Sequence, residues 1–262
     1  MIKRDKIVVF TDLDGSFLDH DSYDYSPALH ALERLKTLNI PVIATTSKTL
    51  AEIDALNLPF VGQARIAENG TVVFDGYDHN AVGMDYGEIR QFLDSVPDAM
   101  RRHIVGFGDM HVEDVIEHTG LSEQQAVLAK DRLGSEPFLW GGDQAGFRAL
   151  ESRAQDAGLM IVQGGRFYHL MSACGGKDKA IHMLITQWKD AEPDTNFITV
   201  ALGDGPNDAD MLASVDYGIK IPNASGHDFS ISDARGKIID APKAGPEGWN
   251  LSMLALLERL SF

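Results

Sequence analysis

The first third of the chain alternates short apolar runs with amphipathic stretches. Residues 7–11 (IVVFT) predict a buried strand, and leucines recur every third position through residues 26–39, which is typical of a helix. Ser26 and Pro27 suit the start of that helix as N-cap and first helical residue. Residues 41–47 (PVIATTS) predict a second strand and residues 48–57 a second helix. Strand–helix–strand order indicates a parallel sheet with helices on its faces.

Residues 64–76 (ARIAENGTVVFDG) predict a strand, a turn at Asn69-Gly70 and a hairpin return. The last third again alternates helices and strands. It predicts a helix over 175–190, a buried strand over 196–204, a further helix over 206–215 and another strand over 217–224. The helix over 175–190 places five apolar residues on one face: Ala180, Ile181, Leu184, Ile185 and Trp188.

The middle of the chain differs from both ends in its order of predicted elements. Helical patterns mix there with strands of antiparallel type, and strands and helices do not alternate. We expect a smaller α+β domain inserted between two halves of one α/β core. The predicted boundaries are 1–85 for the first core segment, 86–173 for the insert and 174–262 for the second core segment.

Composition narrows the class of partner. The net charge of −16 argues against a nucleic-acid backbone or an anionic membrane, but not against a small anionic substrate. The apolar run before Asp12 is too short for a signal sequence, and no stretch approaches the ~20 apolar residues of a membrane span. The single cysteine, Cys174, excludes an intramolecular disulfide, so a reducing, cytoplasmic location is expected. The oligomeric state stays open.

Polar groups follow the predicted strands at four places: Asp12 and Asp14, the stretch 46–48 (TSK), Lys177, and the stretch 203–208 (GDGPND). In α/β sheets ligands bind beyond the carboxyl ends of the strands, so we expect these groups to meet. Clustered carboxylates suit Mg²⁺, and a lysine and a hydroxyl beside it suit a phosphoryl group. A solvated turn would explain Asp12 and Asp14 alone but not the other three places.

These motifs resemble, in order, the four motifs of haloacid-dehalogenase-like (HAD) phosphatases, and the insert resembles their C2-type cap. The implied fold is a Rossmann-like parallel-sheet core with an inserted α+β (C2B-type) cap. Five further stretches resemble mannosyl-3-phosphoglycerate phosphatases: 46–49 (TSKT), 67–70 (AENG), 135–138 (SEPF), 164–170 (GGRFYHL) and 175–180 (GGKDKA).

The resemblance implies that Asp12 is the nucleophile, which forms an aspartyl-phosphate, and that Asp14 is the general acid and base. It implies that Thr46 or Ser47 binds the phosphoryl oxygens, although either residue could instead cap the next helix. It also implies that Lys177 pairs with Asp12 and the phosphoryl group.

The implied cofactor is Mg²⁺, held by the Asp12 carboxylate, the Asp14 backbone carbonyl and Asp204, with Asp208 acting through water. Asn207 and Asp208 also suit the start of a helix, so we expect them to cap it and to serve the site.

On the substrate side, Arg166 and His169 would bind a glycerate carboxylate, and Lys48 could face the same anion. Glu68 and Asn69 could bind sugar hydroxyls, or form only a turn. Asn207 would also contact the substrate. Two further residues of the insert, Arg132 and Glu136, could form a cap surface or an exposed ion pair.

The expected activity is Mg²⁺-dependent hydrolysis of mannosyl-3-phosphoglycerate, a small phosphorylated substrate, to the compatible solute mannosylglycerate. Alternatives are glucosyl-3-phosphoglycerate or a hexose phosphate as substrate, a phosphomutase, and a phospho-acceptor signalling module. The last is disfavoured by Asp14 and by an insert, 86–173, far longer than the roughly 2–6 residues that usually connect elements of α/β units.

Overall fold

The computed structural model describes residues 4–60, 64–164, 166–223, 226 and 228–261. Their contacts divide the chain into two compact units. The first unit comprises Met1–Thr46, Pro59–Ile66 and Lys177–Phe262, and the second comprises Ser47–Leu58 and Ala67–Gly176. Each unit is described on its own.

The first unit is built on a five-stranded parallel sheet with the order β12-β11-β10-β1-β2. The strands are β1 (Arg4–Thr11), β2 (Val42–Ala44), β10 (Thr195–Gly203), β11 (Tyr217–Lys220) and β12 (Lys237–Asp240). From β1 the chain continues outward to β2 on one side, and from β10 it continues to β11 and β12 on the other. The strand order therefore reverses between β1 and β10, which is where ligands bind in doubly wound sheets.

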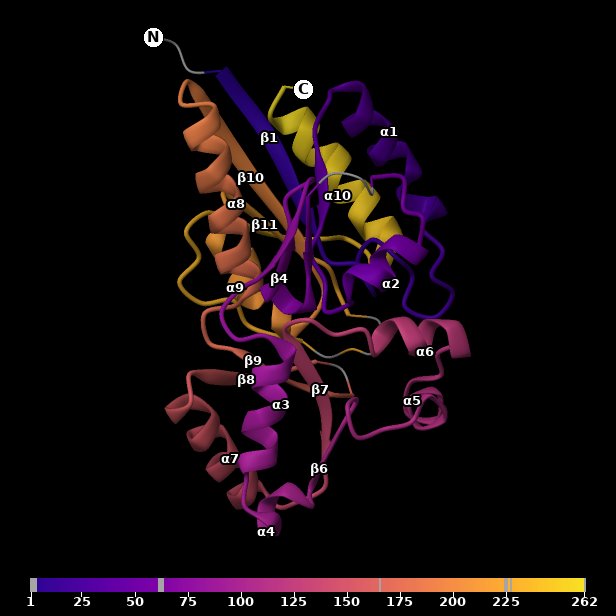
Figure 1. Ribbon diagram of the computed structural model, residues 1–262. Helices are drawn as coiled ribbons and strands as arrows, with labels where there is room; N and C mark the ends of the chain where they lie inside the picture. Colours follow the sequence, from indigo (N-terminus) through magenta and orange to yellow (C-terminus); the bar gives the residue numbers. More distant parts are fainter. Residues whose placement is uncertain (1–3, 61–63, 165, 224–225, 227, 262) are drawn as a thin grey trace. The chain divides into compact units, whose positions relative to one another are not determined.

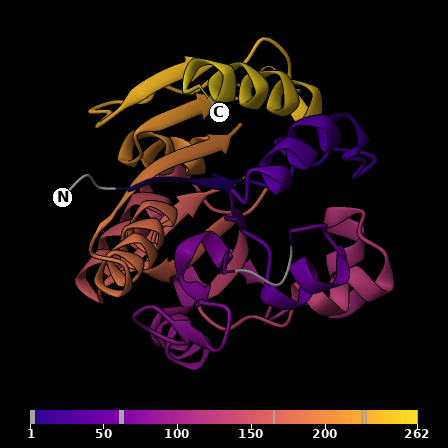
Figure 2. The same ribbon diagram turned by 90° about the horizontal axis from the view of Figure 1, so that it is seen from above.

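Helices cover both faces of this sheet (Figures 1 and 2). α1 (Leu29–Thr37) and α10 (Gly245–Arg259) lie on one face, and α8 (Lys177–Ala191) and α9 (Ala209–Ser214) lie on the other. Four of the five apolar positions predicted for the inner face of α8 are buried, namely Ala180, Ile181, Leu184 and Ile185, and the fifth, Trp188, is half-buried. Trp249 of α10 is fully buried and donates a hydrogen bond to the hydroxyl of Thr11, the last residue of β1, at 3.0 Å.

The second unit contains a four-stranded antiparallel sheet with the order β6-β7-β9-β8. The strands are β6 (Ile104–Gly106), β7 (Ser135–Trp140), β8 (Leu159–Gln163) and β9 (Tyr168–Ser172). α3 (Tyr86–Ser95) and α7 (Gln144–Asp156) pack on one face around Phe138. A second apolar cluster joins α5 (Val112–Thr119) to α6 (Glu123–Ala129).

Shorter elements complete the second unit: α2 (Leu50–Ala55), the hairpin of β4 (Val72–Phe74) with β5 (His79–Ala81), and α4 (Asp98–Arg101). β3 (Arg65–Ala67) ends where the chain passes from the first unit into the second, and a 3₁₀ turn at Glu68–Gly70 follows it. The turn predicted at Asn69-Gly70 is therefore present.

The unit boundaries differ from the predicted domain boundaries, because residues 47–58 and 67–85 group by contact with the second unit. Hydrogen bonding explains part of this grouping: Glu68 binds the backbone of Leu133 and Gly134, and Thr49 binds the carbonyl of Leu128. The chain re-enters the first unit at Lys177.

The predicted cap at Ser26 is wrong. Ser26 opens a 3₁₀ turn, Ser26–Ala28, and its hydroxyl donates to Asp24 at 2.7 Å instead of accepting from the helix backbone. The sequence patterns also did not predict β12 and α10.

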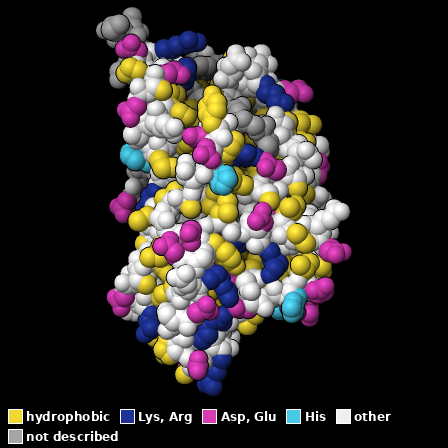
Figure 3. Space-filling view, in the orientation of Figure 1, with side chains coloured by type: hydrophobic (Ala, Val, Ile, Leu, Met, Phe, Trp, Pro, Cys, Tyr) yellow, Lys and Arg dark blue, Asp and Glu magenta, His cyan; other side chains and the backbone are white. Residues whose placement is uncertain are grey.

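Within the described ranges, no helix is both long enough and apolar enough to cross a membrane. The face in Figure 3 mixes basic and acidic side chains. On the second unit Asp109 pairs with both Arg90 and Arg101, at 2.5 Å and 2.7 Å. These pairs keep basic side chains of this unit next to acidic ones.

Phe138 offers a test of the core of the second unit, since its side chain is fully buried where α3 and α7 meet the sheet. We expect Phe138→Ala to lower the free energy of unfolding by about 3–5 kcal/mol, because the cavity adds to the lost transfer energy. The measurement is urea unfolding followed by circular dichroism. Val105→Ala on neighbouring β6 is the control, because Val105 is 43% exposed and its loss should cost less than about 0.5 kcal/mol. Equal losses would contradict this description of the core.

Candidate active site

The candidate site begins at the carboxyl ends of β1 and β10, the two strands between which the strand order reverses. Thr11 of β1 lies opposite Leu202 of β10, and the Asp12 N–H donates to the Leu202 carbonyl at 2.9 Å. Asp12 follows β1 and Asp204 follows β10, so the parallel register brings their side chains to one place. Both residues are buried, with 7% and 6% of their surface exposed.

Lys177, the first residue of α8, supplies the positive charge of the site. Its side chain is buried, and its ammonium group lies 2.8 Å from an oxygen of Asp12 and 2.6 Å from one of Asp208. The neighbouring Lys179 is exposed, so only Lys177 of this pair serves the cluster.

Asp208 uses both carboxyl oxygens within the protein. One accepts from Lys177, and the other accepts from the backbone N–H groups of Asp204 and Gly205, at 3.1 Å and 3.0 Å. Asp208 therefore fixes the turn before α9 and also holds the ammonium of Lys177, which confirms the expected helix-start role. Gly203 makes this approach possible, since a Cβ there would lie 2.5 Å from the Asp208 side chain.

Burial dominates the electrostatics of the cluster. Burial raises the pKa of Asp12; attraction to Lys177 opposes this rise, and repulsion from Asp208 and Asp204 adds to it. Burial and the charge of Asp208 raise the pKa of Asp204 to about 7. Burial alone would lower the pKa of Lys177, but attraction to Asp12 and Asp208 outweighs it and raises that pKa.

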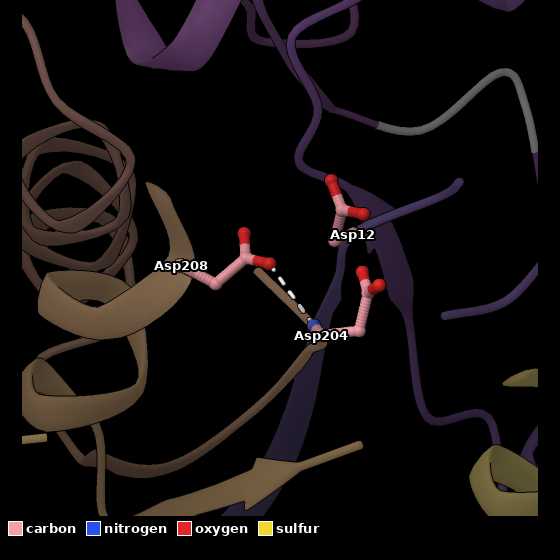
Figure 4. A group of neighbouring side chains, drawn as sticks. All are labelled: Asp12, Asp204 and Asp208. Atoms are coloured by element: carbon pink, nitrogen blue, oxygen red, sulfur yellow. Dashed lines mark hydrogen bonds between the residues drawn. The ribbon is translucent and has the colours of Figure 1, made fainter. Parts of the chain in front are cut away.

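The cluster fits a divalent cation. One carboxyl oxygen from each of Asp12, Asp204 and Asp208 lies within 4.8 Å of the others (Figure 4). Carboxylate oxygens are the ligands that Mg²⁺ prefers. Lys177 pairs with the carboxylates of Asp12 and Asp208. Burial and neighbouring negative charge raise the pKa of Asp12 and the pKa of Asp204, so further positive charge would favour the ionised forms of both.

Asp204 is held by residues on either side of it. It accepts a hydrogen bond from the Ser16 hydroxyl at 3.3 Å and one from the Asn223 side-chain amide at 2.7 Å. Gly15 must lack a side chain here, because its φ is +80° and a Cβ would lie 2.5 Å from an Asp204 oxygen. Sequence reasoning did not single out Asn223, although it follows β11 and the strand-end rule would have found it.

The turn from Asp12 to Leu18 carries Asp14. The Leu18 N–H donates to the Leu13 carbonyl at 2.8 Å, and the Gly15 N–H donates to the Leu18 carbonyl at 2.9 Å. Asp14 is half-buried within this closed turn, in the first unit with Asp12.

Thr46 lies at the same edge of the sheet, two residues beyond β2. The Thr45 N–H donates to the Thr11 carbonyl at 2.8 Å, and the Thr46 N–H donates to the Ile66 carbonyl at 2.9 Å. The alternative role of Thr46 or Ser47 as a helix cap is excluded, because Thr49 caps α2 in a reciprocal pair with Glu52.

The remaining predicted residues, apart from half-buried Asn207, belong to the second unit. They are Ser47, Lys48, Glu68, Asn69, Arg166 and His169. Glu68 is fully buried, and its oxygens accept from Leu133, Gly134 and Ser135, so protein groups occupy the positions expected to bind a sugar.

Arg166 is exposed and donates to the His118 carbonyl at 2.6 Å, whereas His169 is buried on β9. A Cβ at Gly164 would lie 2.9 Å from the His169 ring, so Gly164 makes room for that ring. Gly165, the next residue of the same stretch, lies outside the described residues.

Of the two alternatives for Arg132 and Glu136, the exposed ion pair is wrong. Arg132 is 8% exposed and Glu136 is fully buried, and they have different partners. Glu136 accepts from Arg90 at 2.6 Å and from Tyr86 at 2.8 Å, while Arg132 donates to the Ser47 carbonyl at 2.9 Å. Burial of these charges depends on long-range partners that the local sequence does not reveal.

The chain is similar to a curated protein of Persephonella marina (strain DSM 14350 / EX-H1), a glucosyl-3-phosphoglycerate/mannosyl-3-phosphoglycerate phosphatase. The two are 35% identical over an alignment of 270 positions. The alignment covers 97% of this chain and 98% of that protein. No protein-family model matches the chain.

Solved structures share the fold. BT1666 of Bacteroides thetaiotaomicron, a HAD superfamily phosphatase, aligns with a TM-score of 0.69 at 16% identity, over 98% of this chain and 95% of its own. The subclass IIB sugar phosphatase BT4131 aligns with a TM-score of 0.66 at 15% identity, over 98% of this chain and 99% of its own.

The structural similarities confirm the predicted fold class, a parallel-sheet HAD-type core with an inserted α+β cap. The curated relative identifies the chain as a phosphoric monoester hydrolase. The identity with the curated relative extends over nearly the whole of both chains. The chain therefore belongs to the glucosyl-3-phosphoglycerate/mannosyl-3-phosphoglycerate phosphatase family.

Proposed function

We propose that this chain is a Mg²⁺-dependent phosphatase that hydrolyses mannosyl-3-phosphoglycerate to phosphate and mannosylglycerate, a compatible solute. The observation that carries the proposal is the buried pair of Lys177 and Asp12, 2.8 Å apart, at the switch point of a parallel sheet. The name of the curated relative supports a glycosyl-3-phosphoglycerate as substrate and includes both sugars. Glucosyl-3-phosphoglycerate is therefore the second candidate.

The reaction divides into two displacements. A carboxylate oxygen of Asp12 attacks phosphorus, the bond from phosphorus to the glycerate oxygen breaks, and Asp14 donates a proton to the leaving oxygen. Water then attacks the aspartyl-phosphate, Asp14 takes a proton from that water, and phosphate leaves as Asp12 is regenerated. Lys177 favours the ionised form of Asp12 that the first step needs, and a hydroxyl of Thr46 or Ser47 donates to the phosphoryl oxygens.

The residues that would hold Mg²⁺ are Asp12, the backbone carbonyl of Asp14, and Asp204. Asp208 would act through water, since both of its oxygens already accept hydrogen bonds within the protein. The ion would supply positive charge to the phosphoryl oxygens.

The substrate would be recognised by Arg166 and His169 at the glycerate carboxylate, with Lys48 facing the same anion. Asn207 and Asn69 would contact the rest of the substrate. Arg166 suits a carboxylate because its guanidinium presents several donors in one plane, and the His118 carbonyl accepts from one nitrogen of that group.

Replacing Asp12 and replacing Asp14 should have different effects on catalysis. Asp12→Asn removes the nucleophile, so phosphate release should fall to background. Asp14→Asn removes the proton donor, so kcat should fall about 100- to 10,000-fold while a phosphorylated protein accumulates. The measurements are steady-state phosphate release and intact-protein mass after rapid quenching.

Asp210→Asn is the matched control for both variants, because Asp210 is exposed on α9 and should leave the rate unchanged. Substantial turnover in Asp12→Asn would overturn the nucleophile assignment. A stable phosphorylated wild-type protein without turnover would favour a signalling module, and transfer of the phosphoryl group back to a sugar would favour a phosphomutase.

Mg²⁺ should stabilise the folded protein, since only the folded state gathers the three carboxylates. Binding should add about 2.7 kcal/mol when Mg²⁺ is present at 100 times its Kd. The measurement is Tm with MgCl₂ against NaCl of equal ionic strength. Asp204→Asn should abolish the rise and Asp210→Asn should keep it; an unchanged rise in Asp204→Asn would refute Asp204 as a ligand.

The substrate assignment is tested by phosphate release from a panel of mannosyl- and glucosyl-3-phosphoglycerate, hexose phosphates and an aryl phosphate. Arg166→Ala should raise KM for the glycerate-bearing substrates about 10-fold or more, because a charged hydrogen bond is lost, and should leave the aryl phosphate unaffected. Arg102→Ala, an exposed arginine of the same unit, is the control. An equal effect on all substrates would exclude Arg166 from glycerate binding, and a preference for hexose phosphates would move the assignment to them.

A further inference from the structure

Glu68 is a fully buried acidic residue of the second unit. One of its oxygens accepts from the Leu133 N–H at 2.8 Å, and the other accepts from the Gly134 N–H at 3.1 Å and the Ser135 hydroxyl at 2.8 Å. Ser135 is the first residue of β7, and the other two donors immediately precede it. Two stretches that the sequence singled out, 67–70 and 135–138, therefore meet at one carboxylate.

The backbone at Glu68 is strained. Glu68 and Asn69 have φ values of +50° and +56°, a region that residues with a Cβ seldom adopt. This conformation holds the turn in which the Glu68 N–H donates to the Lys48 carbonyl at 2.9 Å. Glu68 therefore joins β7 to the segment that follows Thr46.

Arg132 reaches the same segment. It is 8% exposed, and it donates to the Ser47 carbonyl at 2.9 Å and to the Ala129 carbonyl at 2.8 Å. Its guanidinium lies 4.0 Å from a Glu68 oxygen and 5.8 Å from the centre of the Phe107 ring. An arginine suits this place, because a planar fork can bind carbonyls in fixed directions and lie over an aromatic ring.

Three consecutive residues after Thr46 thus have their backbone or side chains hydrogen-bonded within the second unit. Arg132 holds the Ser47 carbonyl, the Glu68 N–H holds the Lys48 carbonyl, and the Thr49 hydroxyl donates to the Leu128 carbonyl at 2.9 Å. On the other side, the Thr46 N–H donates to the Ile66 carbonyl in the first unit. The stretch with the two candidate phosphate-binding hydroxyls is fixed at both ends.

We propose that Arg132 and Glu68 are positioning residues that hold the Ser47 peptide group, and with it the Thr46 and Ser47 hydroxyls, in the orientation that binds the transferring phosphoryl group. The inference rests on the proposed function. It replaces sugar binding as the role of Glu68. A misplacement of about 1 Å in such a group can cost about 100-fold in rate, so a contact to a backbone carbonyl is sufficient for a large effect.

The test compares Arg132→Met with Arg90→Met. Both substitutions remove a guanidinium from a fully buried glutamate of the second unit, since Arg90 pairs with Glu136 at 2.6 Å, but Arg90 does not hold Ser47. The readouts are kcat and KM for an aryl phosphate, the inhibition constant of inorganic phosphate, and the urea midpoint. An aryl phosphate is used because it lacks the glycerate.

Arg132→Met should lower kcat about 100-fold and raise the phosphate inhibition constant, whereas Arg90→Met should lower the urea midpoint and leave both constants unchanged. Arg132→Lys, which keeps the charge without the fork, should recover the urea midpoint more fully than kcat. Glu68→Gln should share the loss of kcat.

Equal effects of the two Met variants on kcat and on the phosphate constant would overturn the inference and leave Arg132 as an ordinary buried anchor. If Asp12→Asn stays active, the proposed function fails. If Asp12→Asn is inactive and Arg132→Met retains the wild-type kcat, only the positioning role fails.

Discussion

The site depends on one buried ammonium placed between two buried carboxylates. Lys177 lies 2.8 Å from Asp12 and 2.6 Å from Asp208, and all three side chains are almost wholly removed from water. An isolated charge buried in this way would shift its pKa until it became neutral, so each of these groups depends on the others. Asp204 adds a further carboxyl group, and burial together with the charge of Asp208 raises its pKa to about 7. This arrangement of carboxyl groups fits the Mg²⁺ ion of the proposed function.

The sheet topology explains how residues so distant in sequence form this cluster. β10 pairs in parallel with β1 over the whole length of β1, so the residues that follow the two strands lie close together. Lys177 begins α8, at the point where the chain re-enters the first unit, and Thr46 is the last residue before the chain first leaves it. Two of the proposed phosphate-binding groups therefore lie at crossings between the units.

The sequence was sufficient where periodicity or a strand end decides the structure. The apolar face of α8 and the group of Asp12, Lys177, Asp204 and Asp208 follow from such patterns. Prediction failed where the identity of the hydrogen-bond partner decides the structure. Ser26 donates to Asp24, only two residues before it, instead of capping a helix. Arg132 and Glu136 resemble a surface pair in the sequence, yet each is buried against a different segment. No local pattern reports whether a charged residue will find a buried partner.

The charged residues of the stretches 67–70 and 135–138 are likewise buried against protein groups. Charged and polar residues in such stretches suggest contact with substrate, but a fully buried carboxylate with three protein donors has little capacity left for a ligand. Its free energy depends on those donors, so Glu68, Ser135 and the intervening backbone constrain one another. Glu136, the residue after Ser135, is buried in the same way by Arg90, Tyr86 and the Gly108 N–H. The start of β7 thus lies between two buried glutamates, and the charges in these stretches fix the backbone around the site.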